Sequence, residues 1–206
     1  MRVRLCDFGY GNVGSLSAAL REVGFHSVEV VSEIDLHDSS LIILPGVGDF
    51  SHAMRALGER RADALRLAVE NRTPLVGICL GMQLLFESSS ESGGSSGLGL
   101  IGGSVDQVGF AGSRLPHVGW NSVEFDAGSL LGQGLPNSPD FYFTHSFFCR
   151  PTNPGDILGT TEYGSSFCSA VQRDNVVGLQ FHPEKSGGNG LKVLGNLAGW
   201  SARYGA

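Results

Sequence analysis

Short apolar runs alternate with longer segments of helical periodicity along the first half of the chain. Residues 41–44 and 75–78 are continuous apolar runs next to Pro45 and Pro74, which is typical of strands buried on both faces of a parallel sheet. Residues 3–8 and 28–31 have the length and apolar content of two further strands. The pattern therefore predicts four strands in the first 80 residues.

Two of the segments between these strands have apolar residues at the three- and four-residue spacing of a helix. The first spans residues 13–23 and is followed by Gly24, which suits a helix C-cap. The second covers residues 54–69, and Asp49 and Ser51 can cap its N-terminus. This order of elements predicts an α/β fold of the flavodoxin-like kind. We expect an open, mostly parallel central sheet with helices on both faces.

The second half of the chain has a different pattern. Its apolar positions are rich in Val, Phe, Thr and Tyr and are separated by Gly, Pro and Asn, which predicts strands and hairpins. The expected strand segments are 100–108, 115–125, 141–149, 157–162 and 167–181. A last helix is expected over residues 191–202. We therefore expect extra antiparallel strands in the C-terminal half and a mixed sheet.

Residues 88–97 form the one low-complexity segment, SSSESGGSSG. Such a segment suits either a linker between domains or a loop on the surface of one domain. Only about 90 residues precede it, so we favour a surface loop. We expect residues 1–206 to form a single domain.

Composition and charge narrow the function classes. The chain has 206 residues and a net charge of −6, which argues against broad binding to nucleic acids or membrane surfaces, because both need basic patches. The N-terminus begins with a charged segment, and no apolar run reaches 18 residues, so we expect a cytoplasmic protein. The four cysteines form no CxxC pair, which argues against a zinc site. Each is first interpreted as a small buried hydrophobe.

One cysteine lies in a motif that outweighs this interpretation. Residues 77–81 read Gly-Ile-Cys-Leu-Gly, follow an expected buried strand and precede an apolar segment, residues 82–86, that is expected to be helical. This is the pattern of a nucleophile elbow, in which glycines relieve the crowding of a strained turn. A helix N-terminus beside a thiol favours its ionised form. A buried cysteine at a plain glycine-rich turn remains the alternative.

A second motif supplies a base and an acid. Residues 180–184 read Gln-Phe-His-Pro-Glu and end an expected strand. Residues two apart in extended structure project to the same side, so His182 and Glu184 can touch. A carboxylate in that position fixes the tautomer and orientation of an imidazole. The order Cys, His, Glu differs from α/β-hydrolases, in which the acid precedes the histidine.

The Pro-Gly-Val-Gly segment at residues 45–48 ends another expected strand. Ligand sites of open α/β sheets lie at such ends, and glycines let backbone N–H groups approach a substrate carbonyl. In isolation this segment is better interpreted as a plain turn.

These elements together resemble the class I, or triad-type, glutamine amidotransferases over essentially the whole chain. Within that family the chain is most similar to the glutaminase subunits of imidazole glycerol phosphate synthase. The motifs that carry this similarity are residues 7–12, 45–48, 77–86, 117–121, 144–146 and 180–186. Three positions depart from the expected pattern, Phe8 and Phe147 in place of tyrosine and Val118 in place of methionine, and none lies in the triad.

The resemblance implies a role for each motif residue. Cys79 would be the nucleophile, His182 the general base and Glu184 the residue that orients it. The remaining site residues fall into an oxyanion hole (Val47, Gly48 and Leu80), substrate contacts (Gly46, Gln83, Thr144, His145 and Ser146) and a partner interface (Asn12, Trp120, Tyr142 and Lys185). Trp120 and Tyr142 could equally be core residues, and Lys185 a solvated surface charge.

The resemblance also implies glutamine as substrate, no metal or organic cofactor, and a (β/α)8-barrel cyclase as partner in a heterodimer. Ammonia released from glutamine would pass to that cyclase, which makes imidazole glycerol phosphate and aminoimidazole carboxamide ribotide in histidine biosynthesis. Three alternatives remain at this point. They are another amidotransferase or a γ-glutamyl hydrolase, a non-catalytic regulatory subunit of this fold, and a chaperone or protease with a cysteine elbow. An intact triad disfavours the second, and the His-Pro-Glu motif disfavours the third.

Overall fold

The computed structural model describes residues 1–32, 36, 38–107 and 114–204. Its parallel half consists of β2 (Ser27–Val31), β1 (Arg2–Cys6), β3 (Leu41–Gly46) and β4 (Leu75–Cys79), side by side in that order. All neighbouring pairs among them are parallel. The four expected strands of the first half are thus confirmed, although the first ends at Cys6 instead of Phe8.

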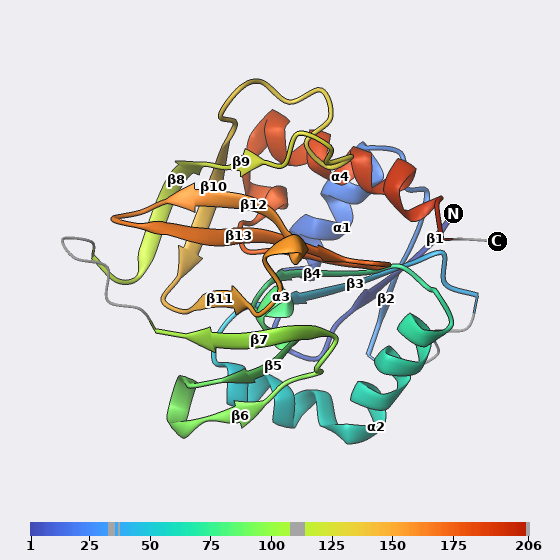
Figure 1. Cartoon of the computed structure of the whole chain (residues 1–206). Coiled ribbons are helices and arrows are strands. Elements are labelled where there is room, and N and C mark those ends of the chain that lie inside the picture. The colour runs from blue at the N-terminus through green and yellow to red at the C-terminus, as the bar shows by residue number, and fades with distance from the viewer. Residues whose placement is uncertain (33–35, 37, 108–113, 205–206) are drawn as a thin grey trace.

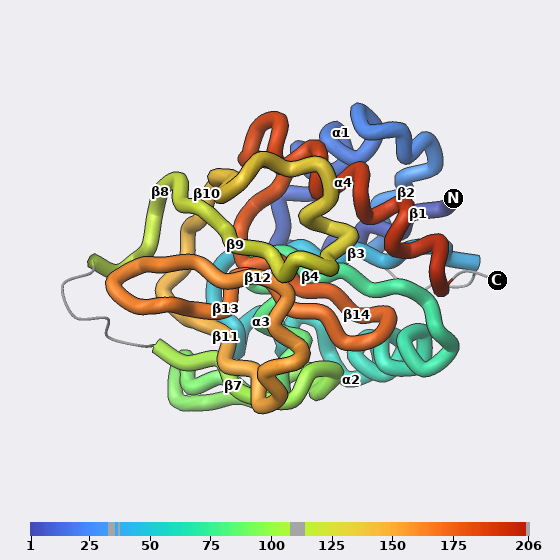
Figure 2. The backbone as a smooth tube through the Cα atoms, turned by 45° about the horizontal axis from the view of Figure 1, so that its top comes forward, coloured from blue at the N-terminus to red at the C-terminus, as the bar shows by residue number. Residues whose placement is uncertain are grey.

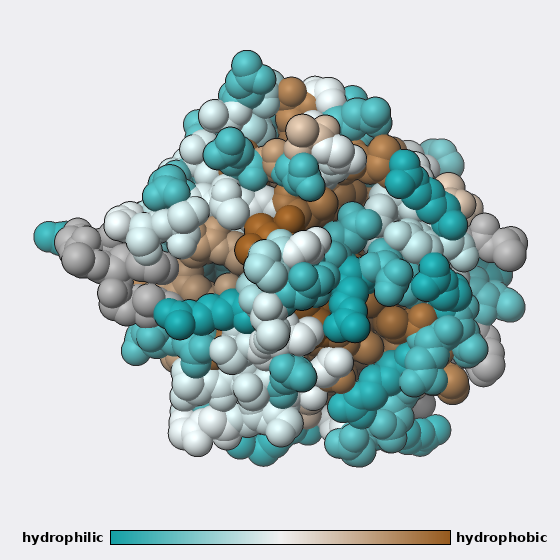
Figure 3. All heavy atoms as spheres, viewed as in Figure 1, coloured by the Kyte–Doolittle hydropathy of each residue, from teal (hydrophilic) through white to brown (hydrophobic). Residues whose placement is uncertain are grey.

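Helices cover both faces of this sheet (Figure 1). The first face carries α1 (Val13–Glu22) and α4 (Gly187–Ser201), and the other carries α2 (Phe50–Glu70). The N-cap of α2 is Asp49, whose carboxylate accepts a hydrogen bond from the His52 N–H at 2.8 Å. Such a cap contributes about 1 kcal/mol to helix stability. The surface around α2 is mostly hydrophilic (Figure 3).

Alternation along β3 shows why the central strands read as continuous apolar runs. Ile43 belongs to the apolar cluster under α1 and α4, whereas Ile42 and Leu44 belong to the cluster under α2. All six residues of β3 are buried. Because both faces are covered by helices, neither set of alternating side chains meets water.

The second half extends the sheet with mostly antiparallel strands. β14 (Val176–Leu179) lies parallel to β4, and β13 (Ser166–Arg173) runs antiparallel to β14. The sheet continues with β11 (Phe148–Pro151), β7 (Ile101–Asp106), β5 (Phe86–Ser89) and β6 (Ser95–Ser96), and β12 (Ile157–Glu162) and β9 (Glu124–Phe125) lie off this path. The predicted mixed α/β sheet is therefore confirmed.

A separate two-stranded sheet pairs β8 (His117–Ser122) with β10 (Asp140–His145). Figures 1 and 2 show this β8–β10 pair at the end of the molecule toward which β3 points. The expected segment 141–149 is thus divided between two sheets, because the chain turns at Ser146 and Phe147 before entering β11. That turn brings β10 against the carboxyl end of β4, where the Cys79 thiol lies 3.9 Å from the Thr144 carbonyl.

Three expected elements differ in extent or type. The helix after Cys79, α3 (Leu80–Leu84), is only five residues long, and the expected helical residue Phe86 begins β5 because it pairs with Ile101. The low-complexity segment is not a plain loop, since it contains β6 and the short 3-10 helix η1 (Glu91–Gly93). The last helix begins at residue 187, four residues early. Position 108 of the expected strand 100–108 lies outside the described residues.

Candidate active site

The backbone at Cys79 has the strained geometry of a nucleophile elbow. Cys79 lies between β4 and α3 with φ 56° and ψ −113°, a conformation that L-residues rarely adopt. A Cβ atom on Gly77 would lie 2.4 Å from the Gly81 carbonyl oxygen, and one on Gly81 would lie 1.8 Å from the Leu44 carbonyl oxygen. Gly81 is therefore required for the turn to pack against β3, and Gly77 is required for the start of α3 to pack against β4.

The Cys79 sulfur lies between an acceptor and a donor. Its Sγ lies 3.9 Å from the Thr144 carbonyl oxygen, to which the thiol can donate, and 3.8 Å from the side-chain nitrogen of Gln180. The residue is 5% exposed. The five-residue α3 that follows has a much weaker dipole than the longer helix expected from the sequence, because a macrodipole is the sum of aligned peptide units.

His182 and Glu184 are in contact, as the sequence predicted, but through a different backbone path. His182 Nδ1 lies 2.9 Å from Glu184 Oε1, and both side chains are 2% exposed. Pro183 begins the 3-10 helix η3 (Pro183–Lys185), so a tight turn and not strand alternation brings the two side chains together. The carboxylate at Nδ1 leaves the buried Nε2 as the nitrogen able to exchange a proton, and none of the described residues has a group in normal hydrogen-bonding geometry to it.

The electrostatics of His182 suit a base beside an ionisable thiol. Burial lowers the pKa of His182, but interactions with Cys79 and Glu184 outweigh burial and raise its pKa to about 9. The imidazolium is therefore stabilised when negative charge develops on its neighbours.

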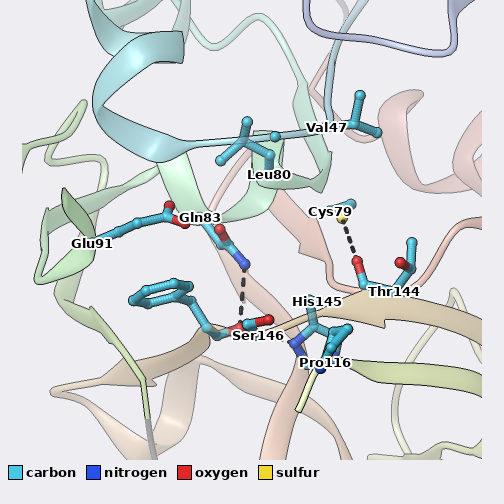
Figure 4. Close-up of a pocket in the computed structure, with 11 residues that line it drawn as sticks. Val47, Cys79, Leu80, Gln83, Glu91, Pro116, Thr144, His145 and Ser146 are labelled. Atoms are coloured by element: carbon cyan, nitrogen blue, oxygen red, sulfur yellow. Dashed lines mark hydrogen bonds between the residues drawn. The ribbon is translucent and has the colours of Figure 1, made fainter.

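A cavity opens directly at the cysteine. It has a volume of about 280 Å³, and it is lined by Val47, Gly48, Cys79, Leu80, Gln83, Glu91, Pro116, Thr144, His145, Ser146 and Phe147. This size suits a small molecule. Figure 4 shows the Cys79 thiol directed at the Thr144 carbonyl across this space. Seven of the eight expected oxyanion and substrate residues line the cavity, and Gly46 instead lies against Leu80 and Gly81 beneath it.

Glu91 lines the same cavity and was not singled out from the sequence. Its carboxylate accepts a hydrogen bond from the Phe50 N–H at 2.8 Å. Burial raises the pKa of Glu91, and the charge of Asp49 acts in the same direction. The one available signal was a lone acidic residue within a serine- and glycine-rich segment, which by itself indicates only solvation.

The expected oxyanion loop is held by another backbone group in this structure. The Val47 N–H donates to the Tyr10 carbonyl at 2.6 Å, so it is occupied. Gly48 has φ 106°, a conformation that favours glycine. Residues 7–12 and 45–48 were both singled out as motifs in the sequence, but the hydrogen bond between them was not predicted.

Both ring nitrogens of His145 are held by protein groups. Its Nδ1 lies 2.9 Å from the Phe147 carbonyl oxygen, and its Nε2 lies 3.1 Å from Nδ1 of His117. Because a carbonyl only accepts, Nδ1 of His145 must carry the proton and Nε2 must accept one from His117. Burial lowers the pKa of His145 to about 3 and that of His117 to about 4, so both rings are neutral near pH 7.

Three of the four expected interface residues lie together. The rings of Trp120 and Tyr142 have centroids 6.2 Å apart, and Lys185 Nζ lies 5.7 Å from the centre of the Tyr142 ring. Trp120 is 57% exposed, so the alternative of core packing is wrong for this residue. Asn12 is the N-cap of α1, and its side chain makes no capping hydrogen bond.

The other three cysteines fit the first interpretation of buried hydrophobes. Cys6, Cys149 and Cys168 are buried, and burial raises the pKa of each thiol, to about 12 for Cys6 and Cys168. Within the described ranges, no group of three or more His, Cys, Asp or Glu side chains is arranged to hold a metal ion. Likewise, no helix among the described residues is long and apolar enough to cross a membrane.

Comparisons with known proteins agree on one family. Residues 4–197 match the family model of class-I glutamine amidotransferases. The chain is 43% identical over 197 residues to imidazole glycerol phosphate synthase subunit HisH of Moorella thermoacetica, covering 95% of this chain and 93% of that protein. It is 44% identical to imidazole glycerol phosphate synthase hisHF of Arabidopsis thaliana, with 93% of this chain and 33% of that protein covered.

Among solved structures, PurLQS from Thermotoga maritima matches with a TM-score of 0.76 over 97% of this chain and 98% of that one. Its 22% sequence identity supports the shared fold alone. The family match and the near full-length relatives go further, and this chain belongs to the class-I glutamine amidotransferase family, among the HisH subunits of imidazole glycerol phosphate synthase.

Proposed function

We propose that this chain hydrolyses glutamine to glutamate and ammonia with Cys79, His182 and Glu184, and that it delivers the ammonia to a cyclase subunit in histidine biosynthesis. The observation that carries the proposal is the buried His182–Glu184 hydrogen bond of 2.9 Å beside a cysteine on a strained elbow at the floor of a cavity. We place the protein in the cytoplasm, as one domain spanning residues 1–206.

The reaction follows from the atoms at hand. The Cys79 thiol gives its proton to Nε2 of His182, and the thiolate attacks the side-chain amide carbon of glutamine. His182 then protonates the departing nitrogen, and ammonia leaves. Water, deprotonated by the same imidazole, attacks the thioester, and glutamate leaves as the Cys79 thiol re-forms. Glu184 keeps His182 in one tautomer through both steps.

The oxyanion of each tetrahedral intermediate needs two backbone donors. The Leu80 N–H at the start of α3 is the first. The second is the Val47 N–H, which must leave the Tyr10 carbonyl before it can serve. The conformation with the 2.6 Å Val47–Tyr10 hydrogen bond is therefore a resting state, and loading of the partner subunit shifts the loop to the active one.

The cavity wall supplies groups for the amino-acid end of glutamine. The Glu91 carboxylate is suited to the substrate ammonium group, since it is the acidic side chain in the lining. Thr144 and Ser146 offer further polar groups in the lining. The side-chain oxygen of Gln83 is used by none of its hydrogen bonds to the described residues. His145 acts on the substrate indirectly, because its hydrogen bond to the Phe147 carbonyl holds the loop that carries Ser146.

The partner is a (β/α)8-barrel cyclase, and the candidate interface is the end of the molecule that carries the β8–β10 pair. Val118 and Trp120 are apolar side chains that are 56% and 57% exposed there. Lys185 and Tyr142 lie beside them, and Asn12 is assigned to the same interface by resemblance. Most ammonia is protonated at neutral pH and cannot attack, so direct transfer between the subunits delivers it in the neutral, reactive form.

The test is Cys79→Ala in the complex with the cyclase. We expect glutamine-dependent synthesis to disappear, because the nucleophile is absent, while synthesis from added ammonium salts continues. Glutamate release and product formation are measured in parallel on the same samples. Retained glutaminase turnover in this variant would show that Cys79 is not the nucleophile.

A further inference from the structure

Gln180 lies next to the reacting sulfur, and the mechanism above gives it no role. It follows β14 directly and is 0% exposed, with its backbone N–H bound to the Ser169 carbonyl at 2.9 Å. Its side-chain nitrogen lies 3.8 Å from Cys79 Sγ, within the reach of a hydrogen bond to sulfur. Its side-chain oxygen accepts from Gln83 Nε2 at 3.1 Å.

The orientation of the Gln180 amide is determined by its neighbours. Gln83 Nε2 donates to the Phe147 carbonyl at 3.3 Å and to the Gln180 oxygen at 3.1 Å. The Phe147 carbonyl can only accept, so Gln83 must present its NH₂ group on this side. Gln180 then has to place its oxygen toward Gln83, and its NH₂ group is left facing the sulfur.

Besides His182, two groups of the described residues therefore lie at the sulfur, and they respond differently to its ionisation. The Thr144 carbonyl at 3.9 Å can only accept, so it stabilises the protonated thiol. The Gln180 NH₂ group can only donate, so it stabilises the thiolate more than the thiol, because hydrogen bonds to charged acceptors are the stronger ones. The short α3 helix makes this side-chain donor more important than it would be beside a long helix.

We propose that Gln180 is a further catalytic residue of this site, whose amide donates a hydrogen bond to the Cys79 thiolate and is aimed by Gln83. The inference rests on the proposed glutaminase function. The proton that leaves Sγ goes to Nε2 of His182, and Gln180 keeps both of its own protons. In the thioester the sulfur carries no charge, so the donor favours the thiolate both as attacking group and as the leaving group when the thioester is hydrolysed.

Alkylation of Cys79 by iodoacetamide tests the inference without using glutamine. In the full-length chain, Gln180→Met keeps the side-chain length and removes the donor. We expect the rate at pH 7 to fall roughly tenfold, the size of one hydrogen bond to a charged group, and the pH profile to move about one unit toward alkaline pH. The rate at the alkaline plateau stays near that of the unsubstituted chain. Modified cysteines are identified by peptide mass, and Gln133→Met, at an exposed loop position, is the matched control.

Two results would overturn the inference. One is an alkylation rate and a pH profile in Gln180→Met that equal those of the unsubstituted chain. The other is an alkylation rate that is lower by the same factor at every pH, which is the signature of a purely structural role. If Gln180→Met does not fold, Gln83→Met decides, because it keeps Gln180 and removes the group that aims its amide. The alkylation assay contains no glutamine, so the expected contact of Gln83 with the substrate does not enter the result. We then expect the pH profile of the alkylation rate to move toward alkaline pH by roughly half as much as in Gln180→Met. An unmoved profile would refute the proposal.

The same measurements separate this inference from the proposed function. If the unsubstituted complex hydrolyses glutamine and Gln180→Met alkylates normally, only the role of Gln180 is wrong. If the unsubstituted complex hydrolyses no glutamine, the proposed function is wrong, and the alkylation profile still reports on the contact between Gln180 and Cys79.

Discussion

At the scale of single residues, the site depends on positions where a side chain would be harmful. Gly81 is the clearest of these, because an added Cβ would lie 1.8 Å from the Leu44 carbonyl oxygen and 2.8 Å from its carbonyl carbon. Both atoms belong to the backbone of β3, which is buried and cannot yield cheaply. The elbow and the strand beneath it are therefore one packed unit.

We expect Gly81→Ala to destabilise the chain by roughly 2 kcal/mol or more, because overpacking against backbone forces either α3 or β3 to move. Urea unfolding at pH 7 measures the change. Gly199→Ala is the control, since Gly199 is an exposed helical position where nothing lies within 4 Å of an added Cβ. That variant should gain up to about 1 kcal/mol from helix propensity. Equal stability of the two variants would mean that the close approach at Gly81 is absent.

At the scale of elements, the β8–β10 pair buries two imidazoles opposite each other. His117 and His145 are cross-strand partners, and the His117 ring also stacks on Phe143 and Tyr163. Protonation of the pair in the folded state would place a charge among these rings. His182, whose own pKa is raised, further disfavours a proton on His145. The pair is therefore a neutral structural link behind the loop that carries Ser146.

The pKa values of this pair predict acid sensitivity. The unfolded state takes up protons at an ordinary histidine pKa near 6.5, whereas the folded pKa values are about 3 and about 4. Below pH 6.5 the unfolded state thus binds more protons, and stability falls as the pH falls. We expect this pair to lower the free energy of unfolding by roughly 1 kcal/mol per imidazole between pH 7.5 and 5.5. His182, whose pKa is raised to about 9, acts in the opposite direction over the same range.

Urea unfolding at the two pH values checks this expectation. His117→Phe retains a ring for stacking and removes one titrating group, so the drop should be smaller than in the unsubstituted chain. His26→Phe, at an exposed position, serves as the control and should leave the drop unchanged. A drop in His117→Phe as large as in the unsubstituted chain would contradict the assignment of the acid sensitivity to this pair.

At the scale of the whole molecule, the sequence predicted what depends on local pattern. Buried parallel strands such as β3 and β4 were predictable because both faces are apolar, and the motifs at residues 77–81 and 180–184 were predictable because their chemistry is contiguous. The strands β5 and β6 were missed, because Ser88 and Ser96 pair through backbone groups that leave no apolar signature. Glu91, from the same segment, was missed because its partner is the backbone N–H of Phe50, which is 41 positions away and leaves no signal in the sequence.

Hydrogen bonds between segments far apart in the chain could not be predicted from the sequence either. The hydrogen bond from the Val47 N–H to the Tyr10 carbonyl joins residues 37 positions apart, and neither residue type signals it, because backbone groups form the bond. Gln180 is similar, since its position in the motif was visible but its contact with Cys79 depends on how β14 lies beside β4. Both contacts depend on how the strands of the sheet and their loops pack together.

The Val47–Tyr10 hydrogen bond also predicts how activity depends on the partner. With this bond in place the Val47 N–H, the proposed second oxyanion donor, is occupied, and loss of one such donor typically lowers turnover by about 10²–10³-fold. We therefore expect the isolated chain to hydrolyse glutamine slowly, and the cyclase with its ligand bound to raise turnover by roughly that factor. Glutamate release by the purified chain, with and without the loaded cyclase, measures the ratio.

The Km for glutamine should change much less than kcat, because the missing donor acts on the transition state and not on the bound substrate. Full activity of the isolated chain would show that the loop opens without a partner, and that the resting state imposes no control on Cys79.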